Sequence, residues 1–216
     1  MSSLADAVLV FILIQNIFVL GSSRIRTIIL TVSLQGVVLS LLPFLVHSGA
    51  LGAREFAVGF GALLLKGIVI PRMLLRAMAD LPIRREIEPL VGFKASLVLG
   101  AVGLMASIGL ASHLPLMDDH GSSSRMFITA AFATSCAGFQ ILTTRMKALT
   151  QVLGYLLLEN GIYIFGVLLL QMTPFLVEVG VLLDLFVAVF VMGIIINHIS
   201  REFTSISTEH LTALRD

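Results

Sequence analysis

The stretch VLGYLLLENGIYIFGVLLL (residues 152–170) decides the fold, because it is long and apolar and yet carries a carboxylate near its middle. A run of this length is what a helix needs to cross about 30 Å of hydrocarbon. A charged side chain at mid-bilayer costs roughly 2.5–3.5 kcal/mol on insertion scales. We therefore expect Glu159 to face the interior of a helix bundle, where such groups usually mark proton or ion paths.

Two other charged residues occupy similar positions. Asp184 lies within VGVLLDLFVAVFVMGIII (179–196), and Lys66 lies within VGFGALLLKGIVI (58–70). The helical rise of about 1.5 Å per residue places all three groups near the midplane of their predicted spans. Glu178 lies only about one turn inside the outer boundary. It fits either a carboxylate at a wet outer mouth or an ordinary interfacial residue.

The composition identifies lipid as the solvent. Of the 216 residues, 57% are hydrophobic and only 12% are charged, against about 25% charged in soluble domains. The apolar residues form blocks and do not alternate as barrel strands do, and backbone groups in lipid must pair internally. We predict an all-α, polytopic transmembrane bundle of about seven helices, the fifth being the shortest. The predicted spans cover residues 5–21, 28–47, 56–78, 90–112, 126–142, 150–172 and 175–198. The first block lacks a basic start and a cleavage motif, so it is predicted to be a retained span.

Basic residues alternate between the predicted loops. Those after the first, third and fifth spans, and in the tail, are Arg24, Arg26, Arg84, Arg85, Arg145, Lys147, Arg201 and Arg215. The opposite side carries only Arg54 and Arg125, together with two aspartates. Because basic loops stay in the cytoplasm, we predict a multi-pass protein of the inner membrane with its N-terminus outside and its C-terminus cytoplasmic.

Several functions are excluded by what the sequence lacks. A net charge of +1 gives no basis for binding nucleic acid. The single cysteine, Cys136, cannot form a disulfide within the chain or an iron–sulfur site. A haem held between spans needs histidines deep in the helices, whereas the histidines here lie at helix ends or in loops. No metalloprotease, nucleophile-elbow or phosphate-loop motif is present. These other chemistries are therefore poorly supported by the sequence.

The three mid-membrane charges suggest proton exchange. Desolvation disfavours the charged form of a buried acid or amine, so a change in their separation can move a proton. We predict that Glu159, Asp184 and Lys66 form a proton relay; a static ion pair that fixes helix packing remains the alternative. Beside Lys66, Pro71 lacks the amide that would bond to the Gly67 carbonyl. The predicted break at these two residues is either the edge of a wet cavity or an ordinary kink.

Short motifs give the chain a resemblance to a known family. Residues 126–216 resemble the small K-type subunit of respiratory complex I and of cation antiporters, through the loop with Arg145 and Lys147, the segment GYLLLENG (154–161) and Asp184. With four further N-terminal spans, Lys66 ahead of a proline and the tail segment HLTAL (210–214), the whole chain is similar to hydrogenase-4 component E. Glu159 lies about one turn later than the first K-type acid, and Asp184 replaces the usual glutamate. The predicted regions are a four-helix region, 1–125, and a K-subunit-like three-helix region with a cytoplasmic tail, 126–216.

The resemblance implies a membrane-arm subunit of a group 4, energy-converting hydrogenase or formate hydrogenlyase-like complex. Such a subunit has no active site, so the resemblance implies no catalytic residue, no metal site and no bound cofactor. It lies in the bilayer with antiporter-like and other membrane subunits, and helps couple redox chemistry elsewhere to translocation of protons or sodium. One alternative is a subunit of a multisubunit sodium/proton antiporter. Another is a purely structural scaffold for antiporter-like subunits. A stand-alone transporter is disfavoured, because no inverted repeat with paired broken helices is evident.

Overall fold

The described part of the chain is built from helices joined by turns. The structure is a computed structural model, which describes residues 3–46, 60–61, 63–80, 90–114 and 121–169. The helices are α1 (Ser3–Gly21), α2 (Ile25–Ser40), α3 (Leu42–Val46), the π-helical turn η1 (Leu65–Val69), α5 (Ile70–Asp80), α6 (Phe93–His113), α7 (Gly121–Thr144) and α8 (Ala148–Leu169). No β-strand occurs among these residues, which agrees with the predicted all-α class.

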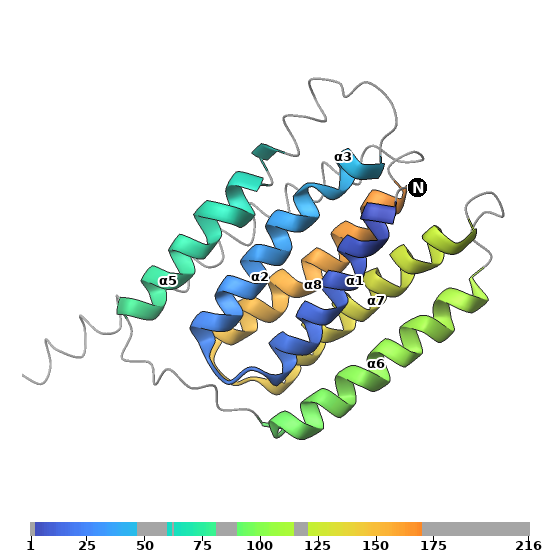
Figure 1. Cartoon of the computed structure of the whole chain (residues 1–216). Helices are drawn as coiled ribbons and strands as arrows, with labels where there is room; N and C mark the ends of the chain where they lie inside the picture. The colour runs from blue at the N-terminus through green and yellow to red at the C-terminus, as the bar shows by residue number, and fades with distance from the viewer. Residues whose placement is uncertain (1–2, 47–59, 62, 81–89, 115–120, 170–216) are drawn as a thin grey trace, which may run out of the picture.

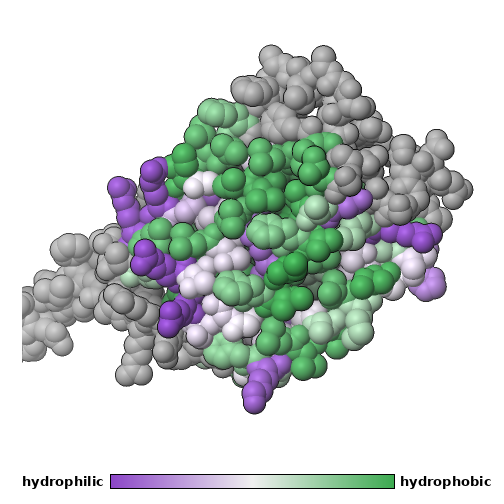
Figure 2. All heavy atoms as spheres, in the orientation of Figure 1, coloured by the Kyte–Doolittle hydropathy of each residue, from purple (hydrophilic) through white to green (hydrophobic). Residues whose placement is uncertain are grey.

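The long helices lie side by side along one common direction (Figure 1). Helix α7 contacts α1, α6 and α8, while α2 contacts α1, α5 and α8. Four helical segments are long and apolar enough to cross a membrane: Leu4–Gly21, Phe93–His113, Arg125–Thr144 and Leu149–Leu168. Figure 2 shows apolar atoms covering much of one face and polar atoms gathered mainly toward the helix ends. These features identify a membrane protein, as the composition predicts.

The helix bounds refine the predicted spans. The second span is divided into α2 and α3 by a turn at Leu41, whose amide donates to the Val38 carbonyl. Pro43 follows and has no amide to continue the helical pattern. Helix α2 has 16 residues, or about 24 Å, which is shorter than the hydrocarbon core. The fifth span was expected to be the shortest, but α7 has 24 residues and is the longest described helix. The seventh span lies outside the described residues, so the count of seven and the orientation stay predictions.

One end of the bundle brings together the ends of α1, α6 and α7. The Arg145 guanidinium is buried there, where Nη2 donates to the Leu20 carbonyl at 3.2 Å and the group lies 4.9 Å from the centre of the Phe93 ring. The Leu90 amide donates to the Thr144 carbonyl at 2.9 Å. Burial lowers the pKa of the Arg145 guanidinium from its ordinary value. We call this end, which carries Arg24 and Arg145, the basic end; it is the end that the charge pattern predicts to be cytoplasmic.

The predicted orientation can be tested with single cysteines in a chain from which Cys136 has been removed. Ser123 lies in the first turn of α7, away from the basic end, and Ser205 lies in the tail outside the described residues. We expect an impermeant thiol reagent applied to intact cells to label Ser123→Cys and to leave Ser205→Cys unlabelled, because basic loops stay inside. Labelling of both positions, or the reverse pattern, would contradict the N-outside arrangement.

Candidate functional site

Lys66 lies on a widened turn of its helix. In η1 the amide of Ile70 donates to the carbonyl of Leu65, five residues earlier. The next residue, Pro71, has no amide to offer the carbonyl of Gly67. The helix expected to break at Gly67 and Pro71 therefore continues into α5 through a π turn. Such turns are frequent at functional sites.

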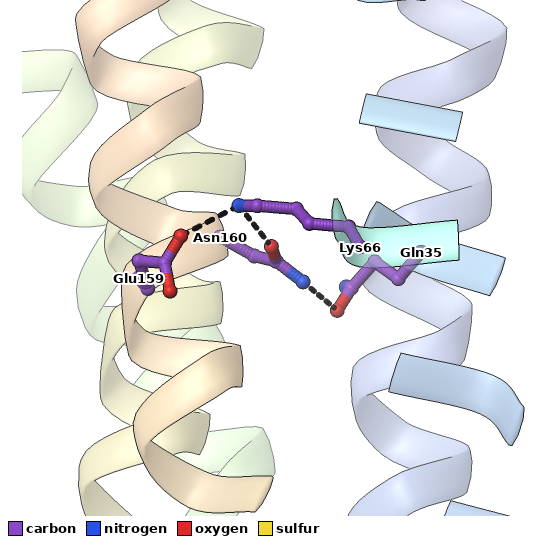
Figure 3. A network of polar contacts seen from close by, with 4 residues as sticks. All are labelled: Gln35, Lys66, Glu159 and Asn160. Atoms are coloured by element: carbon purple, nitrogen blue, oxygen red, sulfur yellow. Dashed lines mark hydrogen bonds and ion pairs between the residues drawn. The ribbon is translucent and has the colours of Figure 1, made fainter. Parts of the chain in front are cut away.

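Close packing against α2 fixes the position of this turn. A Cβ atom added to Gly36 would lie 2.9 Å from Lys66 Cβ and 3.1 Å from Lys66 Cδ. A Cβ atom at Gly67 would lie 2.8 Å from Val37 Cγ2. Distances below 3.0 Å leave no room for a side chain, so both glycines are needed for this approach. The lysine stem is consequently held against α2 and extends toward α8 (Figure 3).

The lysine ammonium forms a buried ion pair in the centre of the bundle. Lys66 Nζ lies 2.7 Å from Glu159 Oε1 and donates to Asn160 Oδ1 at 3.1 Å (Figure 3). It also lies 5.1 Å from the centre of the Tyr163 ring. The side chains of Lys66 and Glu159 are only 6% and 3% exposed. Because both side chains are almost completely buried, the two charges interact more strongly than they would at a surface.

The ion pair continues into a chain of hydrogen bonds that crosses the bundle. Asn160 Nδ2 donates to Gln35 Oε1 at 3.2 Å, and Gln35 Nε2 donates to Asn16 Oδ1 at 2.9 Å. Asn16 Nδ2 donates to Thr134 Oγ1 at 2.7 Å. Each amide thus accepts a hydrogen bond on the side of Lys66 and donates on the other side. The chain runs in one direction, with a cation as its first donor.

These buried groups form one layer, which we call the polar layer. Its members are Asn16, Gln35, Lys66, Thr134, Glu159 and Asn160. An apolar cluster that includes Ile29 and Leu153 lies on its basic-end side. A second cluster, which includes Leu9 and Ile164, lies on the other side. A polar layer between two apolar clusters is the arrangement expected near the middle of a membrane-spanning bundle, where polar groups need partners within the protein.

The structure brings together some of the predicted site residues. Glu159 and Lys66 meet directly, and the turn of Gly67 and Pro71 carries the lysine. Asp184 and Glu178 lie outside the described residues. Within the described part of the chain, no group of three or more His, Cys, Asp or Glu residues could hold a metal ion. The polar layer contains two groups that can hold a proton, the Glu159 carboxylate and the Lys66 amine. The strength of their ion pair depends on the distance between them.

Sequence reasoning missed three members of the polar layer. Asn16, Gln35 and Thr134 were not singled out, and Asn160 was noted only as part of a motif. A signal was present, because Asn16 and Gln35 each interrupt an apolar run at about the depth of Lys66. Counting residues from the predicted helix ends would have placed them at the level of the charged groups.

The chain is similar in sequence to several known proteins. It is 29% identical over 206 residues to the uncharacterized protein Rv0085 of Mycobacterium tuberculosis, which covers 95% of this chain and 93% of that protein. It is 27% identical over 156 residues to hydrogenase-4 component E of Escherichia coli, covering 71% and 70%. The match to hydrogenase-4 component E of Shigella flexneri has the same extent. No family model and no solved structure gives a significant match. The chain is thus similar to hydrogenase-4 component E.

Proposed function

We propose that this chain is a membrane subunit of a group 4, energy-converting hydrogenase or formate hydrogenlyase-like complex. In this role the polar layer helps couple redox chemistry on other subunits to proton translocation. The observation that carries the proposal is the buried Lys66–Glu159 pair, whose atoms lie 2.7 Å apart. It joins η1 to α8, a helix long and apolar enough to cross a membrane, in a chain similar to hydrogenase-4 component E. Glu159 is the proton carrier, and Lys66 modulates it.

Energetics favour a working pair over a purely structural one. A buried ion pair carries a large desolvation penalty, and apolar residues of similar volume often give equal or greater stability. A need for stability alone is therefore a poor reason to keep Lys66 and Glu159. The π turn that carries Lys66 also suits a working group, because such turns are frequent at functional sites. When the ammonium is near, the carboxylate stays charged; when it withdraws, the carboxylate takes up a proton.

The remaining predicted residues complete the proposal. Asp184 is the second mid-membrane carboxylate, and Glu178 is the carboxylate at the outer mouth. A subunit of a multisubunit sodium/proton antiporter is the second candidate, because the same polar layer would serve ion exchange without a redox partner. Identifying the proteins that co-purify with the chain distinguishes these two functions.

The test uses the assembled complex purified through a tag on this chain. We expect redox subunits and larger antiporter-like subunits to co-purify. In vesicles, Glu159→Gln should strongly reduce redox-driven proton uptake per assembled complex, because it keeps the side-chain size and removes the titratable proton. Its amide oxygen can still accept a hydrogen bond from the Lys66 ammonium, so enough complex should assemble for the measurement. The peripheral redox centres should still react with artificial donors.

Gln151→Leu is the control, because it changes a neutral side chain on the same helix as Glu159. Gln151 lies on α8 and is exposed, at the basic end, where its amide donates to the Arg145 carbonyl at 3.2 Å. Proton uptake should survive this change. Normal uptake in Glu159→Gln would show that the carboxylate is structural, and co-purification without any redox subunit would favour the antiporter.

A further inference from the structure

A small recess adjoins the lysine of the polar layer. Its lining residues come from three elements: Val32, Ser33 and Gly36 of α2, Lys66 and Ile70 around the π turn, and Leu156 and Asn160 of α8. Its volume is near the lower limit for holding one water molecule. It is the part of the described polar layer where a small molecule has room beside Lys66.

The recess lies on the basic-end side of Lys66. Helices α2 and α8 both start at the basic end, so Ser33 and Leu156 lie about one turn nearer to it than Gly36 and Asn160 do. Ile70, about one turn after Lys66, joins the apolar cluster on that side. All the apolar lining therefore lies between the lysine and the predicted cytoplasmic face.

Most of the lining of the recess is apolar, but three polar residues belong to it. A buried water usually makes about three hydrogen bonds to protein groups. Two of the three are Asn160 and Lys66, whose ammonium contacts Glu159 and Asn160. The Ser33 hydroxyl donates to the Ile29 carbonyl at 2.6 Å, which leaves its oxygen able to accept. An anion would also meet a positive charge here, but the recess lacks the size for one.

We propose that this recess binds a water molecule that links Lys66 to the basic side of the membrane. The inference rests on the proposed function and adds to it the side from which the pair exchanges protons. In the exchange the water accepts one proton from the Lys66 ammonium and passes one proton toward the basic end. The neutral amine then takes the proton carried by Glu159, which restores the ammonium and leaves the carboxylate charged. The reverse steps load Glu159 with a proton again.

An apolar layer separates this water from the basic end. One turn beyond the recess lie Ile29, Leu74 and Leu153, each fully buried. A proton that reaches this water therefore cannot continue toward the basic end until these side chains move apart. Such a barrier prevents a leak through the pair.

The test fills or enlarges the recess at Val32, which is 4% exposed. Val32→Ile adds one carbon and takes the place of the water, whereas Val32→Ala leaves more room. Packing alone makes the alanine change the more harmful one, since removing core atoms leaves a cavity while adding one methylene is often mild. Water occupancy reverses this order: we expect Val32→Ile to lower redox-driven proton uptake several-fold, and Val32→Ala to lower it less.

Val152→Ile is the matched control. Val152 is also 4% exposed and belongs to the same apolar cluster, but it does not line the recess. It should assemble and pump like the natural chain. A greater loss in Val32→Ala than in Val32→Ile, or equal losses in Val32→Ile and Val152→Ile, would overturn the inference.

If a Val32 variant fails to assemble, a second measurement still tests the water site. An experimental map of the natural complex that resolves ordered water should show density in the recess within hydrogen-bond distance of Lys66 Nζ. An acyl chain there, or no density, would overturn the water site. If the water is seen while Glu159→Gln pumps normally, the proposed function fails and the water site stands. If Glu159→Gln stops pumping while Val32→Ile does not lower it, only the water link fails.

Discussion

Replacing Lys66 by methionine should greatly reduce the amount of assembled complex. The change keeps the length of the stem but removes the positive charge 2.7 Å from Glu159 Oε1. Breaking a buried ion pair by removing one partner typically costs about 3–5 kcal/mol. It also removes the first donor of the hydrogen-bond chain, so the Asn160 carbonyl oxygen loses the bond from Lys66 Nζ. The amount of complex on native gels and its thermal transition measure the effect.

A double variant shows whether the loss comes from the unbalanced charge. Lys66→Met combined with Glu159→Gln removes both charges and leaves neutral groups of similar size. Because residues in one ion pair are coupled, the double change should be milder than the sum of the single changes. It should recover most of the assembly while proton uptake stays low. Fully additive losses would show that the two side chains do not act as a pair in the native complex.

The sequence alone predicted the helical class and the central charges for physical reasons. An apolar run of membrane-spanning length has few other folds available. A charge within such a run has to face other protein groups. This rule singles out Glu159 and Lys66 from the sequence alone. Their pairing follows from equal depth on helices that run in opposite directions.

The rest depended on packing that a linear sequence does not reveal. A lone asparagine or glutamine in a span costs less than a charge, so Asn16 and Gln35 drew no attention. Pro71 predicts a local disturbance of the helix, but a proline is compatible with a kink, a break or a π turn. The π turn also packs closely against α2 at Gly36, and a contact between two helices is not visible in a linear sequence. The division of the second span near Leu41 is different, because it was predictable from the sequence: Pro43 has no amide to continue the helical hydrogen bonds.

The polar layer also requires α8 to lie close to α7. Gly138 of α7 faces the backbone of α8: an added Cβ atom would meet Leu158 N, and would lie 2.7 Å from both Leu158 Cα and the Gly154 carbonyl oxygen. Small residues at such positions let membrane helices approach backbone to backbone. Leu158 immediately precedes Glu159, so the separation of the two helices sets where the carboxylate lies.

Gly138→Ala should therefore destabilise the chain, although alanine is the better helix former by about 1 kcal/mol. The three nearest neighbours of the new methyl group are backbone atoms, which cannot rotate away, so α8 has to move outward. Overpacking of this kind costs about 1–3 kcal/mol and occasionally more. Displacing α8 also shifts Glu159 relative to Lys66, so assembly and redox-driven proton uptake should both fall. The measurements are the yield of complex on native gels and proton uptake per assembled complex.

Gly166→Ala on α8 is the matched control, because an added Cβ atom there has no neighbour within 4 Å in the described part of the chain. Only the helix propensity changes at this position, so its stability should stay the same or rise slightly. The two substitutions are chemically identical and differ only in what the new methyl group meets. Opposite signs for the two variants would establish the close α7–α8 contact as the cause. Equal stability of Gly138→Ala and Gly166→Ala would show that the two helices lie farther apart in the assembled complex.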